Sequence, residues 1–487
     1  MQKSILWIVF FICQWVLAQE KQEALDEVKI VKETKTFTTK NGNIKVDVSN
    51  SIYNSVPNTM DLLAKLPKIQ VSPDKESITV IGKGNPLLYI DNQKVEINDL
   101  NTLAVDDIKT IEIINNPSSK YEAEGRVVIL ITRKLSKKEG FKVDVTENAS
   151  FKTYFNNYFG INSSVKKNKL EFKANFNYNQ IKVWESNGNN FTIPDYAIIS
   201  NYLVTAVTKR PQYVLGGGLF YKINEDDYFS VNCSRRAQKD IFDIVTDTYN
   251  EEQSNSNFIN TLNANDENRN FTNGFLNYNH KIKSIDGQLF SGFQYSNFNQ
   301  QIASVISNNY NDTSFEWSQN RNQKIDIEVY SGRADFEKEF KNKMKFELGA
   351  LYLQANSKTD FSIEIINPNS ITLSDYNYKE TNIAGYSNLS ESFKRVNYSV
   401  GLRAENTIAK GKNSSDSRLV IDKNYINLFP KTEIEIPIDS TNTVMFNYAK
   451  SISRPNFSTT SQVSAYINPY FVWSNSINLN PTITDAI

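Results

Sequence analysis

The chain has 487 residues, of which 54 are basic, 54 are acidic, one is histidine and two are cysteine. A polytopic helical membrane protein is excluded, because no stretch of about 20 apolar residues follows the N-terminus. The 25 tyrosines and 29 phenylalanines disfavour a disordered chain, and the zero net charge disfavours a nucleic-acid partner. His280, Cys13 and Cys233 are too few for a zinc site, so we predict no metal site and no cofactor.

Residues 1–18 have the pattern of an export signal. Lys3 precedes an apolar run from Ile5 to Cys13, and small residues or valine stand at Val16 and Ala18. This run is too short to cross a bilayer as a helix. We therefore expect cleavage after Ala18 and export of the mature chain from the cytoplasm.

Residues 44–134 mix one helix with several strands, which predicts a small α+β domain. Asn58 is positioned to cap the helix, with Asp61 in its first turn. Residues 80–95 read as two strands around a Gly-Asn-Pro turn. Residues 108–134 read as two further strands, separated by an Asn-Pro turn and a short acidic loop.

Residues 135–487 change to a period of two. Apolar and polar residues alternate strictly in segments such as 170–179, 344–352 and 396–405, which is the pattern of strands with one apolar and one polar face. We count about 13 such strands, of about 11–14 residues each, up to Lys450. The predicted fold class is therefore mainly β, with a small α+β domain at the N-terminus.

The connections between these strands favour a membrane barrel over a soluble sandwich or solenoid. Very short polar turns, such as the one at Lys394-Arg395, alternate with predicted long loops. An outer-membrane barrel has short turns on the periplasmic side and long loops on the other side. The predicted long loops lie near residues 184–210, 240–269, 300–324, 358–380, 410–424 and 454–481.

Several motifs resemble the TonB-dependent outer-membrane receptors of the Bacteroidetes type, over essentially the whole mature chain. The most specific is IEIINNPSSKYEAEG (111–125), which resembles a stretch of the plug domain of that family. NTMDLLAKLPKIQV (58–71) and VIGKGNPLLYIDNQKV (80–95) resemble other plug segments, and SISRPNF (451–457) resembles a barrel segment. The chain departs from the family at Arg126-Val127-Val128, where a glycine-rich entry to the last plug strand is usual.

The resemblance implies a plug (44–134) inside a transmembrane antiparallel β-barrel (135–487) in the cell outer membrane. It also implies plug-gated uptake driven by TonB. Residues 19–43 would form a periplasmic arm, in which Leu25, Asp26, Glu27 and Val28 resemble the segment that pairs with TonB as an added strand. The alternative for this segment is an ordinary linker strand. The alternative function is a structural or adhesion barrel without active uptake.

The implied partners are the TonB complex, outer-membrane lipid, an unidentified extracellular substrate and a surface lipoprotein. Paired carboxylates such as Asp226-Asp227 fall in predicted turns, where nothing fixes their separation. We therefore predict no catalytic residues and no enzyme activity.

Six residues are candidates for contacts in the barrel. Arg403 and Glu405 lie on the polar face of a predicted strand, where they would line the lumen and contact the plug. We expect a similar contact for Arg126. The tryptophans in or beside the predicted long loops would either pack in an aromatic girdle or stack on a flat ligand. They are Trp184, Trp317 and Trp473.

The end of the chain gives a further expectation. After the thirteenth predicted strand, a long loop leads to Pro481 and to a strand that only begins at Thr482. Bacterial single-chain barrels have even strand numbers, and the resemblance implies about 22 strands. We therefore expect that the chain ends before its barrel closes, as a fragment or a prematurely ended reading frame.

Overall fold

The computed structural model describes residues 35–487 with short gaps. The predicted export signal (1–18) and the TonB-binding residues Leu25, Asp26, Glu27 and Val28 lie outside the described residues. The gaps are residues 41, 73, 74, 76, 101, 102, 135–138, 152, 195–197, 225, 253, 254, 414–418, 440, 441, 456–463 and 475–478.

The plug is an α+β unit built on a six-stranded sheet with the order β1-β2-β7-β8-β5-β6. β5 and β8 are parallel, and the other neighbours in this sheet are antiparallel. Its elements are β1 (Phe37–Lys40), β2 (Asn43–Asp47), η1 (Ile52–Ser55), α2 (Thr59–Ala64), β3 (Ile69–Val71), β4 (Ile78–Val80), β5 (Leu87–Ile90), β6 (Gln93–Val95), α3 (Ile97–Leu100), η2 (Val105–Asp107), β7 (Ile108–Ile114) and β8 (Val128–Arg133).

Helix α2 forms where the sequence predicts it. The Asn58 side chain accepts a hydrogen bond from the Asp61 amide at 2.9 Å, which satisfies one of the free donors of the first turn. Met60 and Leu63 are fully buried in the plug core. The predicted helix, its cap and its apolar face are therefore confirmed.

The plug sheet begins before residue 44. β1 pairs with β2 from Phe37↔Val46 to Lys40↔Asn43, inside the range 19–43 that the sequence assigns to the arm. A four-residue strand on a sheet edge buries little apolar surface, so its sequence carries no clear periodic signal. The sheet of this unit therefore begins at Phe37, before the predicted boundary at residue 44.

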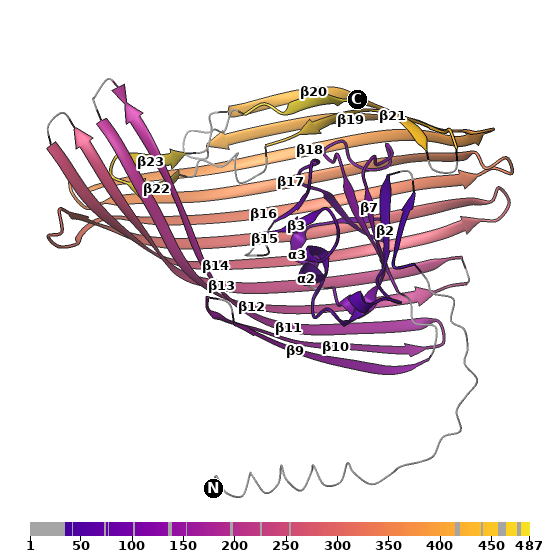
Figure 1. Cartoon of the computed structure of the whole chain (residues 1–487), viewed down its shortest axis with the longest axis horizontal. Coiled ribbons are helices and arrows are strands. Elements are labelled where there is room, and N and C mark those ends of the chain that lie inside the picture. The colour runs from indigo at the N-terminus through magenta and orange to yellow at the C-terminus, as the bar shows by residue number, and fades with distance from the viewer. Residues whose placement is uncertain are drawn as a thin grey trace, which may run out of the picture. The chain divides into compact units, whose positions relative to one another are not determined.

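The barrel part is one 14-stranded antiparallel sheet in which consecutive strands are neighbours, and β9 and β24 are its two edges (Figure 1). This confirms the predicted fold class. Its strands are β9 (Gly140–Phe151), β10 (Phe155–Lys167), β11 (Leu170–Ile193), β12 (Ile198–Lys222), β13 (Tyr228–Glu252), β14 (Asn255–Ile282), β15 (Gly287–Tyr310), β16 (Glu316–Glu339), β17 (Lys345–Ile365), β18 (Ser370–Phe393), β19 (Val396–Asn413), β20 (Leu419–Pro437), β21 (Thr443–Ser453) and β24 (Thr482–Ala486).

The two faces of this sheet differ as the alternation predicts. On β19, the Val400 and Leu402 side chains are about half exposed on the outer face, at 51% and 48%. Arg403 and Glu405 are buried on the inner face. Paired tyrosines such as Tyr295 and Tyr330, whose ring centroids are 5.1 Å apart, belong to neighbouring strands.

In the described part of the chain, no helix is both long and apolar enough to span a membrane.

The predicted strand and loop lengths are wrong. The ten strands β11 to β20 have 18 to 28 residues, and most of each predicted long loop except 454–481 is paired strand. A bilayer crossing needs only about 9–11 residues. The strands therefore continue far beyond the membrane on the side opposite the short turns. The inner residues there are largely polar even where they are buried, as are Thr246, Thr248 and Asn250 of β13. The outer face no longer meets lipid, so the apolar signal that reveals a strand in a sequence is lost.

One predicted loop contains a separate hairpin. β22 (Ser464–Asn468) and β23 (Phe471–Ser474) lie within the predicted loop 454–481 and pair with each other. The hairpin reaches strands that are distant in sequence. The Phe471 ring stacks on Tyr202 of β12 at 5.8 Å, and Asn468 donates to the Thr248 hydroxyl of β13 at 3.0 Å.

Candidate functional site

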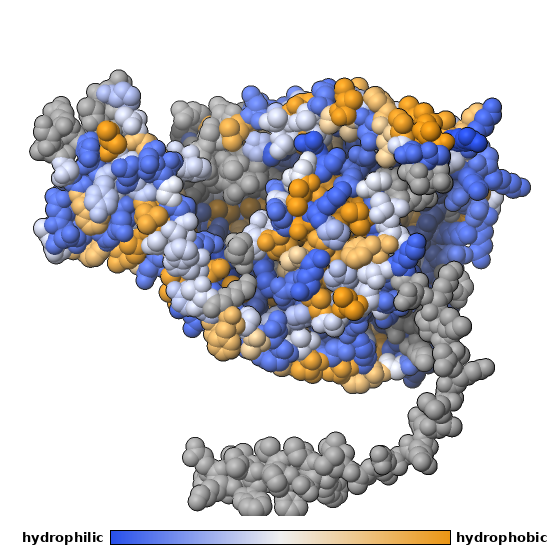
Figure 2. All heavy atoms as spheres, viewed as in Figure 1, coloured by the Kyte–Doolittle hydropathy of each residue, from blue (hydrophilic) through white to orange (hydrophobic). Residues whose placement is uncertain are grey.

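The plug lies against the inner face of the barrel sheet, and polar contacts join the two. Gln93 donates to Gln294 of β15 at 3.1 Å, and Lys173 of β11 donates to Asp107 at 2.7 Å. In Figure 2, the face on which the plug lies carries hydrophobic residues interspersed with hydrophilic ones. The face of the plug that is visible in Figure 2 is therefore not a continuous apolar surface.

The plug loop, which we define as residues 115–127, carries the motif that the sequence analysis found most specific. Lys431 of β20 donates to the Pro117 carbonyl at 2.9 Å, and Arg333 of β16 donates to the Lys120 carbonyl at 3.2 Å. The Ile452 amide donates to the Ala123 carbonyl at 3.1 Å. Three barrel strands thus bind the backbone of this one loop.

A close approach to the plug loop requires glycine at position 401. A Cβ atom there would lie 2.3 Å from the Ser119 hydroxyl oxygen, which is less than any van der Waals contact. Ser119 is fully buried. The absence of a side chain on β19 therefore lets the plug loop touch the barrel wall.

A partly buried ion-pair network joins the plug loop to β19 and β21. Arg454, directly after β21, donates to Glu124 of the plug at 2.8 Å and to Glu405 of β19 at 2.6 Å. Arg403 lies 2.5 Å from Glu405, and these two side chains are 1% and 2% exposed. Because Arg454 has carboxylate partners on both the plug and the wall, its guanidinium couples the two parts.

The structure separates the three candidate lumen residues. Arg403 and Glu405 are buried on the inner face, and Glu405 also accepts a bond from the Ala123 amide at 3.4 Å. Arg126 is exposed, where it lines a cavity of about 220 Å³ together with Lys431. Sequence reasoning missed the part played by Arg454, although this residue stands in the quoted segment SISRPNF.

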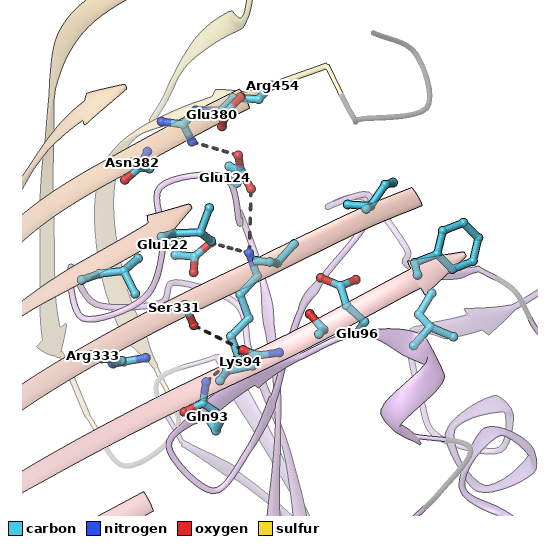
Figure 3. Close-up of a pocket in the computed structure, with 18 of the residues that line it drawn as sticks. Gln93, Lys94, Glu96, Glu122, Glu124, Ser331, Arg333, Glu380, Asn382 and Arg454 are labelled. Atoms are coloured by element: carbon cyan, nitrogen blue, oxygen red, sulfur yellow. Dashed lines mark hydrogen bonds and ion pairs between the residues drawn. The ribbon is translucent and has the colours of Figure 1, made fainter. Parts of the chain in front are cut away.

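A cavity of about 570 Å³ lies between the plug and the inner wall (Figure 3). On the plug side, Lys94 of β6 points toward Glu122 and pairs with it, and Glu124 lies 4.0 Å from the same ammonium group. Glu96 lies on the same side. On the wall, apolar side chains from β14 to β17 face these charges, namely Phe271, Phe298, Ile327, Val329, Leu351 and Leu353.

The cavity therefore offers charged and apolar surfaces to a small molecule. Such a mixture binds and orients a ligand, because apolar walls supply affinity and a few polar groups supply direction. In the described part of the chain, no group of three or more histidine, cysteine, aspartate or glutamate side chains is arranged to hold a metal ion.

The three candidate tryptophans lie in strands and not in loops. Trp184 is in β11, Trp317 in β16 and Trp473 in β23. Their side chains are 54%, 53% and 63% exposed. Among the ring contacts of the described residues, none joins two of these tryptophans. The structure therefore does not bring them together as one aromatic platform.

Asp99 of the plug has a carboxyl group that is buried where the plug meets the barrel wall. Burial raises its pKa from the usual 3.8 to about 7, although hydrogen bonds from the Glu96 amide and the Asn273 side chain act in the opposite direction. Asn273 belongs to β14 of the barrel, so this carboxyl group is also part of the interface.

Replacement of Arg454 tests the ion-pair network. Arg454→Ala leaves Glu124 and Glu405 without this cation, and we expect a loss of about 1–3 kcal/mol in the free energy of unfolding, because Arg403 still compensates Glu405 and Lys94 lies near Glu124. The measurements are thermal unfolding of the full chain in detergent and the rate of protease cleavage in the plug. Lys209→Ala, which removes an exposed cation on β12, is the matched control. Equal stability of Arg454→Ala and the wild type would contradict the proposed role.

The raised pKa of Asp99 predicts a pH dependence. Between pH 4 and pH 7 the folded chain keeps a proton that the unfolded chain has lost, so stability falls as the pH rises through this window. Asp99→Asn stays neutral and should remove this part of the slope, measured as the difference in unfolding midpoint between pH 5 and pH 8. Asp226→Asn, in an exposed turn, should keep the wild-type slope. A parallel slope in Asp99→Asn would exclude Asp99 as its cause.

Comparison with known proteins places this architecture. Residues 280–487 match the outer membrane protein beta-barrel family. A search of curated protein sequences gives no match. Among solved structures, the chain is similar to the alcaligin outer membrane receptor FauA from Bordetella pertussis, with 13% identity and a TM-score of 0.52, over 85% of this chain and 63% of that one.

Two further solved structures have the same arrangement. The copper transporter OprC has 9% identity and a TM-score of 0.58, over 86% of this chain and 64% of that one. The ferric preacinetobactin receptor BauA from Acinetobacter baumannii has 10% identity and a TM-score of 0.54, over 92% and 67%. The chain thus spans about two thirds of the length of these structures. Residues 280–487 thus match the model of the outer membrane protein beta-barrel family, and the chain has the fold of these outer-membrane receptors.

Proposed function

We propose that this protein takes up a substrate across the outer membrane by a movement of its plug that TonB drives. The proposal rests on the polar character of the contacts between plug and barrel. Hydrogen bonds and ion pairs dominate them, as in the contacts of Lys431, Arg333 and Arg454 with the plug loop. Water can replace such partners when the plug moves, whereas separated apolar surfaces have no substitute partner.

The plug core supports this interpretation. Nineteen buried residues form the core of the plug, and all of them lie between Val46 and Ile131. Among the described residues of the barrel, Phe275 packs against this core. A small apolar cluster of Ala123, Phe429 and Ile452 is a second apolar contact between plug and barrel. Because the plug has its own core, a displacement from the wall does not require that it unfold.

The arm before the plug would transmit the force. We propose that Leu25 to Val28 pair with TonB as an added strand, which needs backbone hydrogen bonds and little sequence specificity. The chain then enters β1, which is the edge strand of the plug sheet and pairs there with β2. A pull on the arm would therefore act first on a four-residue edge strand.

The proposed substrate is a small molecule that enters between the long hairpins and binds in the 570 Å³ cavity. The solved structures with this fold include an alcaligin receptor, a ferric preacinetobactin receptor and a copper transporter. For this chain we favour a chelate over a bare metal ion, because the mature sequence offers one histidine and one cysteine. A surface lipoprotein as partner stays a prediction.

Deletion of residues 24–31 tests the dependence on TonB. The host strain is grown with metal chelates, glycans and peptides as single nutrient sources, and the nutrients that require the wild-type protein are identified. We expect growth on those nutrients to fall to the level of the empty strain, because the plug can no longer be pulled. Unchanged growth, with the deletion variant present in the outer membrane, would favour the structural or adhesion barrel.

A disulfide between plug and wall tests the movement itself. A Cβ atom at Gly401 would lie 3.0 Å from the Ser119 Cβ, which is closer than the ~3.5–4.5 Å of natural disulfides, so the plug loop and β19 must separate by about 1 Å for the bond to form. We expect the Ser119→Cys/Gly401→Cys variant, in a Cys233→Ser background, to lose uptake when oxidised and to regain it when reduced. Each single cysteine variant is a control. Full uptake by the oxidised pair would exclude a large movement of the plug loop.

A further inference from the structure

A second, smaller cavity lies between the plug and the wall formed by β11 to β14. It has a volume of about 90 Å³, and Gln93 of the plug lines both this small cavity and the 570 Å³ cavity. On β13, Arg236 lines the larger cavity, and Ser234, the next inward residue toward the short turn between β12 and β13, lines the small one. Because short turns are periplasmic, the small cavity lies on the periplasmic side of the larger one.

Part of the wall of the small cavity carries no side chains. Gly216 and Gly218 are inward positions of β12, in phase with the buried Val214, and we call these two residues the glycine stripe. A glycine weakens the interior of a strand and often marks a place where another group approaches the backbone closely. Here the Asn175 and Asn232 side chains of the neighbouring strands lie over the stripe, and a Cβ atom at Gly218 would be only 2.6 Å from the Asn232 side-chain oxygen. Movable amide groups therefore fill the space that fixed side chains of β12 would otherwise occupy.

The plug is held at this wall by contacts between side chains. Three of the described hydrogen bonds join plug and wall around the small cavity. They are Arg133 to Asn232 at 2.9 Å, Lys173 to Asp107 at 2.7 Å, and Asn273 to Asp99. A side chain can change its rotamer while the backbone stays in place. These three bonds can therefore open without a prior displacement of either backbone.

On the opposite wall, the barrel holds the plug by its backbone. Lys431 and Arg333 donate to carbonyl groups of the plug loop, and so does the Ile452 amide. The cavity of about 220 Å³ on that side shares none of its described lining residues with the 570 Å³ cavity, and the plug loop lies between the two. A gap on that side therefore requires a movement of the loop backbone.

The plug element that faces the glycine stripe is a short edge strand. β6 has three residues and pairs with β5 at the edge of the described plug sheet. A strand of this length at an edge gives up few backbone hydrogen bonds when it is displaced. β6 can therefore shift while the rest of the sheet stays paired.

We propose that the movement of the plug opens its widest gap at the glycine stripe, and that the substrate passes from the 570 Å³ cavity to the periplasm through this gap. This inference rests on the proposed uptake and names its route. A shift of β6 with Gln93 joins the two cavities, and rotation of Asn175 and Asn232 clears the bare backbone of β12. The ion pair between Lys173 and Asp107 closes the gap in the resting state.

The test measures how fast a buried thiol becomes accessible in living cells. Ser234→Cys, a nearly isosteric change at the small cavity, is made in a Cys233→Ser background, which removes the free cysteine of the described residues. The probe is a charged maleimide that does not cross the inner membrane, added to cells with and without a protonophore. Labelling of Ser234→Cys should be at least about tenfold faster in energised cells, because the rate follows the fraction of time for which the site is open.

Asn388→Cys is the matched control on the opposite wall. Asn388 is buried and lies five residues from the periplasmic end of β18, close to the six residues for Ser234 on β13. Its labelling should rise by a smaller factor in energised cells. An equal or larger rise for Asn388→Cys would overturn the route and leave the plug movement standing. If neither variant reacts faster in energised cells, the proposed uptake fails, and the route fails with it.

Two glycine variants test the stripe itself in the Ser234→Cys background. Gly218→Leu places a side chain in the gap and should remove most of the increase in labelling. Gly217→Leu points to the outer face of the same strand and should keep the full increase. A full increase in both variants would overturn the proposal. Unchanged heat-dependent mobility in gels shows that each variant is folded, and the comparison of Ser234→Cys with Asn388→Cys does not depend on either glycine variant.

Discussion

The hydrocarbon of a membrane offers no hydrogen-bonding partner to a peptide group, and the rest of this structure depends on that constraint. Each long strand from β10 to β20 meets it by pairing with the preceding and the following strand. An antiparallel ladder of this kind fixes a period of two, so every strand has one face toward lipid and one toward the lumen. The polar residues that bind the plug lie at the alternate positions of each strand that face the lumen.

Because neighbouring residues point to opposite sides, one strand serves two surfaces. On β19, Glu405 contacts the Ala123 amide and Arg454 on the inner side, while Leu402 and Lys410 are exposed on the outer side. The inner set acts on the plug, and the outer set meets the bilayer. A substitution on one face can therefore change the contacts of that face while the ladder of the strand stays intact.

Much of the fold could be predicted from local sequence patterns. Contacts between residues that are distant in sequence could not. The Asn58 cap and the alternation in residues 396–405 arise from neighbours a few positions apart. The bond between Arg454 and Glu124 joins residues 330 positions apart, which no local pattern encodes. The sequence around Trp184 has no alternation of apolar and polar residues and therefore predicts a loop. In the structure this segment is part of β11, and both of its faces are exposed to solvent, so no such alternation is needed. Inward phase alone identified Arg403 and Glu405 as candidates, but not their partners.

The proposed uptake requires an interface that holds the plug and can also release it, and the charges at this interface suit both requirements. Removal of one partner from a buried ion pair costs several kcal/mol of stability, because the remaining charge is left without compensation. The intact pair adds little net stability, because the cost of desolvating both charges offsets their attraction. Arg454, with Glu124 on the plug and Glu405 on the wall, keeps a bond to the wall when the plug leaves. Glu124, in turn, lies 4.0 Å from Lys94 of the plug itself. Each side would therefore retain an opposite charge if the plug separated from the wall, which is compatible with the proposed movement.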